Sequence, residues 1–169
     1  MSPRMERDAL GEKKIPDDAY YGVQTQRAVE NFPISGRTAH PELIIATVQI
    51  KKAAAQVHVA LGLFSHDKGS AIIQAADEIL AGQLRDQFVV DVFQAGAGTS
   101  HNMNTNEVIA NRAIEILDGQ KGNYSIVHPN DDVNKSQSTN DVMPTACHQQ
   151  APANLSAQRQ LRGMKVCVF

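Results

Sequence analysis

The sequence predicts a mainly α-helical protein with one short extended segment. Two observations favour helices: apolar residues recur at helical intervals in several stretches, and a glycine stands near the end of each stretch. A third observation sets the extended segment apart, because the run of β-branched and aromatic residues 88–94 breaks the helical pattern. With 169 residues, the chain has the length of one domain with a single sizeable core.

The N-terminal residues differ from those that follow. Residues 15–36 contain two prolines and two glycines and are expected to be irregular. The first helix is predicted over residues 40–62, because Pro41 stands where a first helical turn tolerates proline and Gly62 lies near the end.

Two more helices are predicted from amphipathic patterns. One opens at a potential capping residue, Ser65, and closes at Gly82. The other is expected over residues 106–119. The apolar faces consist of Ile72, Ile73, Ala76, Ile79 and Leu80 in the former, and Ile109, Ala113 and Ile116 in the latter.

Composition and charge exclude several classes of protein. The chain has 18 acidic and 16 basic residues and no clustered basic face, which argues against binding to nucleic acid or to a membrane surface. No apolar run is long enough to span a membrane, and the charged N-terminus lacks the apolar stretch of a signal peptide. Two cysteines, Cys147 and Cys167, form no CxxC motif. A reducing, cytoplasmic location is therefore expected.

Small polar side chains crowd the segment 94–107. Gly96 and Gly98 permit close backbone approach, and six short donors or acceptors follow them at the start of the next helix. Such a helix N-terminus can bind an anion, but a glycine turn with helix capping explains the same residues. Nucleotide binding is disfavoured, because His101 stands where GxGxxG needs glycine and no GK[ST] follows.

A second polar segment contains Ser138, Thr139 and Asn140 in succession. These residues suit a helix start that receives a carboxylate, and they equally suit capping of that helix. Upstream, His128 precedes a proline and could join a polar site. Neither His128 nor His101 has the local spacing of a metal-binding pair, so no metal site and no cofactor are predicted.

Three long segments, residues 18–36, 94–113 and 128–146, resemble the aspartase/class II fumarase superfamily of lyases. They occur in the family's order and at similar intervals, between about Arg4 and Ala146. The resemblance implies the N-terminal helical domain of that fold and a small dicarboxylate substrate. It also implies an anti elimination that passes through a doubly charged aci-carboxylate intermediate and releases fumarate.

By the same resemblance, certain residues should bind the substrate. These are Thr99, Ser138, Thr139 and Asn140. A secondary dicarboxylate site should comprise His128, Asn130 and Asp131. Preorganised hydroxyls, amides and helix N-termini can stabilise the charge that develops on a carboxylate without a metal ion.

The choice between ammonia and water as the leaving group depends on details of these motifs. Ala97 and Thr139 stand where fumarases usually have serine, and both residues resemble aspartases, as does the segment 18–36. The segment "HPNDDVNKSQ" instead resembles fumarases. L-Aspartate ammonia-lyase is the prediction, and class II fumarate hydratase is the alternative.

The resemblance ends near Ala146, where the family continues into a long apolar helix of a central bundle. Here Pro152 and several glutamines interrupt the pattern. The mobile loop that carries the family's catalytic serine base is absent, as is a histidine segment from another subunit of the homotetramer. In that family three subunits assemble each active site.

The domain organisation expected from this comparison has three parts: an N-terminal lyase domain (1–137), the start of a central helical domain (138–146) and a poorly ordered tail (147–169). With no catalytic base and no assembly bundle, the chain should be inactive alone, as a truncated or frameshifted product. It should also expose apolar surface. A non-catalytic interaction module is the alternative.

Overall fold

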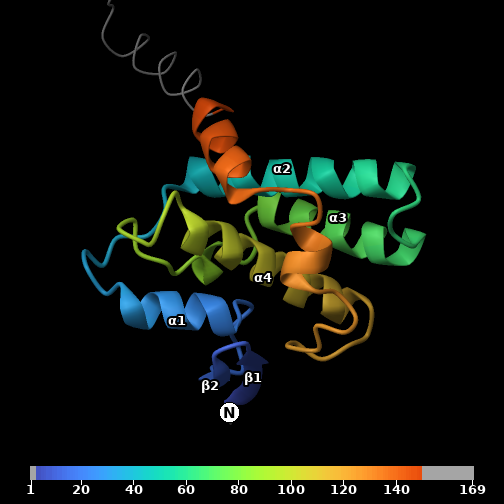
Figure 1. Ribbon diagram of the computed structural model, residues 1–169. Coiled ribbons are helices and arrows are strands. Elements are labelled where there is room, and N and C mark those ends of the chain that lie inside the picture. Colours follow the sequence, from blue (N-terminus) through green and yellow to red (C-terminus); the bar gives the residue numbers. More distant parts are fainter. Residues whose placement is uncertain (1–2, 150–169) are drawn as a thin grey trace, which may run out of the picture.

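The computed structural model describes residues 3–149, and these residues form helices with one small antiparallel sheet (Figure 1). The mainly α-helical fold predicted from the sequence is confirmed. The elements are β1 (Arg4–Asp8), β2 (Gly11–Ile15), α1 (Val23–Asn31), α2 (Pro41–Ala60), α3 (His66–Leu80), η1 (Arg85–Gln87), α4 (Thr99–Ile116) and η2 (Pro129–Val133). Residues 139–149 are also helical. The predictions for Pro152 and the rest of the tail lie outside the described residues.

The three long helices form the core. α2 and α3 lie side by side, and α4 passes through the centre of the molecule (Figure 1). Their facing side chains are fully buried: Val48, Ile72, Ile79, Ile109 and Ile114. Each such side chain contributes about 1.5–3 kcal/mol by its removal from water.

Local signals mark the beginnings of α2 and α3, as predicted. Pro41 opens α2, and His40 Nδ1 accepts a hydrogen bond from the Glu42 N–H at 3.3 Å. Ser65 Oγ accepts one from the Lys68 N–H at 3.4 Å. These bonds pair backbone donors that a helix leaves free in its first turn.

The prediction that residues 15–36 are irregular is wrong for α1. This helix begins without a capping side chain of its own, and two distant carboxylates replace the cap. Glu107 of α4 accepts from the N–H groups of Gly22, Gln24 and Thr25 at 2.9–3.0 Å, and Glu6 accepts from Val23 N–H at 2.9 Å. Burial raises the pKa of the Glu107 carboxyl, while these donors oppose the rise.

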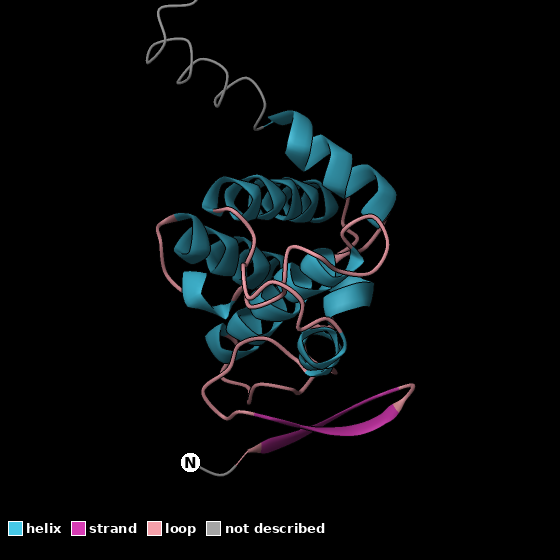
Figure 2. Ribbon diagram, turned by 90° about the vertical axis from the view of Figure 1, so that its left-hand side faces the viewer, coloured by secondary structure: helices cyan, strands magenta, loops and turns pink. Residues whose placement is uncertain are grey.

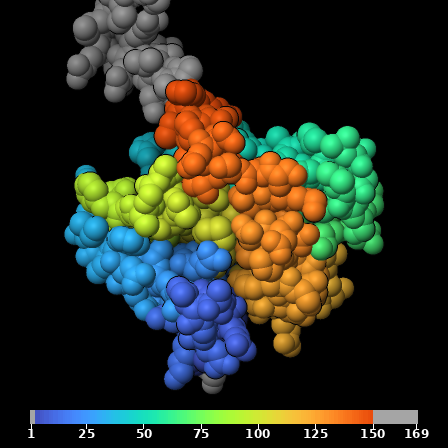
Figure 3. Space-filling model, in the orientation of Figure 1, coloured from blue at the N-terminus to red at the C-terminus, as the bar shows by residue number. Residues whose placement is uncertain are grey.

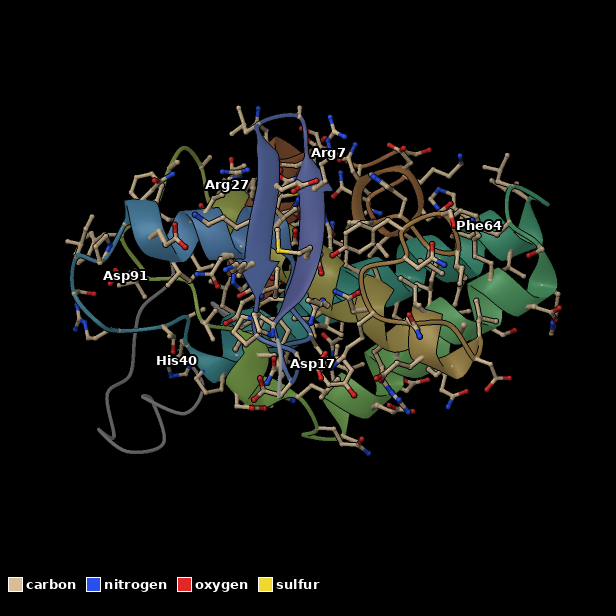
Figure 4. All side chains as sticks on the ribbon, turned by 90° about the horizontal axis from the view of Figure 1, so that it is seen from below. Arg7, Asp17, Arg27, His40, Phe64 and Asp91 are labelled. Atoms are coloured by element: carbon tan, nitrogen blue, oxygen red, sulfur yellow. The ribbon has the colours of Figure 1, made fainter. Side chains whose placement is uncertain are left out.

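The hairpin of β1 and β2 lies at one edge of the molecule, away from the three long helices (Figure 2). Its strands pair from Arg4–Ile15 to Asp8–Gly11. Arg27 of α1 lies beside this hairpin (Figure 4) and forms a two-pronged ion pair with Asp8, at 2.9 and 3.0 Å. The sequence did not predict the hairpin, because most of its residues are charged and show no apolar alternation.

Residues 88–94 are non-helical, as predicted, but they pair with another segment only through an isolated bridge between Thr38 and Asp91. The Asp91 carboxylate accepts from the N–H groups of Phe93, Ser35 and Gly36 at 2.7–2.8 Å. These bonds hold the pKa of Asp91 at about 2. The turn 35–36 is thereby tied to the segment that leads into α4.

Apolar surface is exposed at the end of α2, as the sequence predicts. Val57, Leu61 and Leu63 are 54%, 67% and 50% exposed. None of the helices within residues 3–149 is both long and apolar enough to cross a membrane.

Candidate functional site

The two polar segments predicted to bind substrate meet at the N-terminus of α4. Gly96 and Gly98 have positive φ values of 60° and 82°, and α4 begins at Thr99. Met143 packs against Gly98, where an added Cβ would lie 2.4 Å from the methionine Cε. Only glycine allows this approach. On the surface, the segment before α4 adjoins the helical residues that follow 138 (Figure 3).

Thr139 is joined to α4 by a hydrogen bond. The buried Asn102 donates from Nδ2 to Thr139 Oγ1 at 3.2 Å. Because this bond uses a lone pair of the hydroxyl, the Thr139 proton remains available to an acceptor outside the protein. Thr139 is half-buried and held in place by this bond, and its hydroxyl can still donate to a ligand.

Ser138 caps the helix that begins at residue 139. Its Oγ accepts from Asn140 N–H at 3.2 Å, and its carbonyl accepts from the N–H groups of Asp141 and Val142, both at 3.0 Å. The hydroxyl proton of Ser138 has no acceptor within residues 3–149. Capping therefore uses one lone pair of Ser138 and leaves its donor free.

Thr99 and Asn140 are exposed, and within the described part of the chain their side chains make no hydrogen bond. Together with Ser138 and Thr139, they give four polar side chains with unused donors beside two helix N-termini. That arrangement suits an anion, since backbone N–H groups and the helix dipole favour negative charge at the same place.

A buried polar layer lies behind these residues. Lys51 of α2 is fully buried, and its Nζ donates to Asn134 Oδ1 at 2.6 Å. Asn102 Nδ2 donates to the same oxygen at 3.1 Å. Burial lowers the pKa of Lys51 to about 7.

His101 belongs to this layer and lies in the interior. Its Nε2 lies 3.1 Å from Thr47 Oγ1. Burial, and secondarily the charge of Lys51, lower the pKa of His101 to about 4, so the ring is neutral near pH 7.

Sequence reasoning missed Lys51, Asn102 and Asn134 as members of the site. One signal was available for Asn102: residues 100–107 are mainly polar yet occupy the first turns of a helix, and all of them are buried. No comparable signal marks Lys51, which stands next to a second lysine.

The residues of the predicted secondary site also lie together, around η2. His128 Nδ1 accepts from the N–H groups of Asn130 and Asp131, at 3.2 and 3.0 Å. Asn130 Nδ2 donates to Asp131 Oδ1 at 3.2 Å. Asp132 Oδ2 accepts from His128 N–H and from Lys68 Nζ. Asn134 follows η2 directly, so this turn is connected to the buried layer of the first site.

Residues 3–149 contain no cluster of three or more histidine, cysteine or acidic side chains that could hold a metal ion. The first site itself offers neutral donors, helix N-termini and one buried amine.

Comparisons with known proteins identify the family of the chain. A family model described as "Lyase" matches residues 11–164. An aspartate ammonia-lyase from Bacillus sp is 59% identical over 86% of this chain, which corresponds to 31% of that protein. A class II fumarate hydratase from Halobacterium salinarum is 57% identical, with the same shares. The chain thus spans about a third of the length of these relatives.

Solved structures show the same fold. A fumarate lyase:delta crystallin structure from Brucella melitensis superimposes with a TM-score of 0.83 and 57% identity, over 85% of this chain and 34% of that one. A class II fumarase from Schistosoma mansoni gives a TM-score of 0.82 at 37% identity, over 87% and 31%. The family match, the relatives and the shared fold show that the chain belongs to the lyase family that includes aspartate ammonia-lyases and class II fumarate hydratases.

Proposed function

We propose that Thr99, Ser138, Thr139 and Asn140 form the carboxylate-binding part of an aspartate ammonia-lyase active site. The observation that supports this proposal is that all four side chains keep unused donors at the meeting point of two helix N-termini. A dicarboxylate brings two negative charges, and such a site can bind them without a metal ion.

In the proposed reaction, a base removes the Cβ proton of L-aspartate and the electron pair moves onto the adjacent carboxylate. The resulting aci-carboxylate carries two negative charges on one group. It collapses by forming the Cα–Cβ double bond and expelling ammonia, which leaves fumarate. The donors of Thr99, Ser138, Thr139 and Asn140 stabilise the charge of the intermediate. By the family resemblance the base is a serine of the mobile loop, and none of these four residues belongs to that loop.

We propose that the chain alone is inactive, because by the family resemblance the base belongs to another part of the fold and three subunits assemble each active site. The turn at His128, Asn130 and Asp131 is proposed as the secondary dicarboxylate site.

Fumarate hydratase is the second candidate, because the segment "HPNDDVNKSQ" resembles fumarases. The relatives of both kinds are nearly equally similar, at 59% and 57% identity. Ala97 favours ammonia release, because it lacks a hydroxyl that could hold water near the leaving group.

A chimera tests the proposal. Residues 3–146 of this chain replace the matching segment of the Bacillus sp aspartate ammonia-lyase, and fumarate is followed by its ultraviolet absorbance with L-aspartate or L-malate as substrate. We expect fumarate from aspartate. Ala97→Ser is the informative second variant, since a gain of malate turnover would mark position 97 as a determinant of the leaving group. A chimera that folds as a tetramer but turns over malate in place of aspartate would favour the fumarase alternative.

A further inference from the structure

Lys51 is a buried cation without an acidic partner. Its Nζ makes one hydrogen bond within the described residues, to the neutral Asn134 Oδ1, and no carboxylate among residues 3–149 pairs with it. The next residue offers a contrast, because Lys52 lies at the surface of α2 and pairs with Asp77. Burying an ammonium without a counter-ion is costly, so the charge of Lys51 needs a source of compensation.

The elements around Lys51 do not provide that compensation. α4 contributes His101, which is neutral near pH 7, and the amide of Asn102. Two charged groups of α3, Lys68 and Asp77, are already paired with Asp132 and Lys52. In the segment after η2, Lys135 lies over the Phe64 ring.

Hydrogen bonds connect Lys51 to the candidate substrate site. Lys51 Nζ donates to Asn134 Oδ1, which also accepts from Asn102 Nδ2, and the same amide group donates to Thr139 Oγ1. Asn102 is 1% exposed, and its own Oδ1 has no partner within the described residues. Two amides therefore stand between the buried ammonium and the threonine hydroxyl.

We propose that Lys51 is the buried counter-charge of the dicarboxylate, and that it positions Thr139 through Asn134 and Asn102. The inference rests on the proposed function, because it requires a carboxylate at Thr139. Lys51 of α2 thus belongs to the site without touching a substrate atom. It acts on the dicarboxylate through its charge, and on Thr139 through the amides of Asn134 and Asn102.

The proposal predicts that binding of the dicarboxylate is coupled to protonation of Lys51. A bound dianion favours the charged form of Lys51, so it raises the pKa of that amine from about 7. Below pH 7 the amine is already protonated, so binding requires no proton uptake. Above pH 7 binding must take up a proton, and the affinity therefore falls as the pH rises.

The test uses the purified chain with succinate, an unreactive dicarboxylate, as the probe. Calorimetry at pH 8 in two buffers of different ionisation enthalpy measures proton uptake, and titrations from pH 6.5 to 9 measure the affinity. Lys51→Met should weaken succinate binding about tenfold, which is an ordinary size for coupling between two sites, and should abolish proton uptake. Lys52→Met, on the same helix, is the matched control and should change neither quantity.

Stability separates this role from a structural one. Lys51→Met should leave Tm unchanged or higher, because it removes a buried charge while Asn134 Oδ1 keeps Asn102 as a donor. A lower Tm with unchanged succinate affinity would overturn the inference. If Lys51→Met does not fold, the Lys51 Nζ titration of the unmodified chain, followed by NMR, replaces it: the midpoint must rise when succinate is added.

Failure of the proposed function and failure of the Lys51 inference give different results. Succinate that leaves the amide signals of Thr99 and Thr139 unmoved would reject the proposed function, and the inference with it. Succinate that moves those signals without proton uptake, and without a shift of the Lys51 midpoint, would reject the inference alone.

Discussion

The turn at 128–131 and the helix starts at Thr99 and 138–140 contain similar residue types, but their hydrogen bonds differ. In the turn, His128 Nδ1 accepts two backbone N–H groups and Asn130 donates to Asp131, so each of these side chains is bonded within the turn. At the helix starts, the side chains of Thr99 and Asn140 make no hydrogen bond within residues 3–149, and Thr139 keeps a free proton. Residue type alone therefore does not separate a polar side chain that is bonded within the protein from one that keeps an unused donor.

We call the side chains that keep unused donors the open group: Thr99, Ser138, Thr139 and Asn140. Side chains that are bonded within the protein form the closed group. The comparison predicts that side chains of the open group affect the reaction, and the largest effect is expected at Thr139. In the chimeric lyase, Thr139→Val should lower kcat about 10²–10³-fold, as the loss of one preorganised donor does elsewhere. Thr145→Val, an exposed threonine on the same helix, is the control and should leave kcat unchanged. Steady-state rates of fumarate formation measure both. Equal losses in the two variants would remove the distinction between open and closed groups.

Glu107 belongs to the closed group, because its carboxylate accepts from three backbone N–H groups. Its removal should therefore affect stability alone. Glu107→Ala leaves the N–H groups of Gly22, Gln24 and Thr25 without a partner, at a cost of about 2–3 kcal/mol in the free energy of unfolding. Urea denaturation measures this loss. Glu115→Ala, on the same helix but partly exposed, should cost less than about 1 kcal/mol. Faster hydrogen exchange confined to α1 would identify the lost cap as the cause.

The caps of α1 also explain where prediction from sequence failed. α2 and α3 were predictable because their signals are local: Pro41 and Ser65 begin them, and apolar residues follow at helical intervals. The carboxylates that begin α1 lie at Glu6 and Glu107, 17 and 82–85 residues from the N–H groups they accept. No pattern within residues 15–36 could reveal them.

The residues of the site also divide into those that could be predicted from local sequence and those that could not. Thr99 and the segment 138–140 could be selected from the sequence, because short polar residues beside glycine or at a helix start are unusual and resemble a family motif. Lys51 and Asn134 could not, since their roles depend on contacts across 83 residues. A lysine beside another lysine on a helix also gives no indication of which one is buried.

His128 should show a moderate effect, and on stability in particular. His128→Ala removes the acceptor for two backbone N–H groups, which should cost about 1 kcal/mol, the usual value of a capping side chain. Thermal unfolding of the purified chain measures it. His66→Ala, whose ring is exposed at the start of α3, is the control and should leave Tm within error. A His128 variant as stable as the unmodified chain would show that the turn does not depend on its internal bonds.

Asn140 provides the smallest expected change in stability and the most direct test of the open group. Its side chain makes no hydrogen bond within the described residues, so Asn140→Ala should change the free energy of unfolding by less than about 0.5 kcal/mol. Succinate binding by the same purified variant should nevertheless weaken, because one donor to the dicarboxylate is lost. A stable variant that binds succinate as well as the unmodified chain would show that an unpartnered polar side chain at this helix start is only solvated surface. The open group would then consist of Thr99, Ser138 and Thr139.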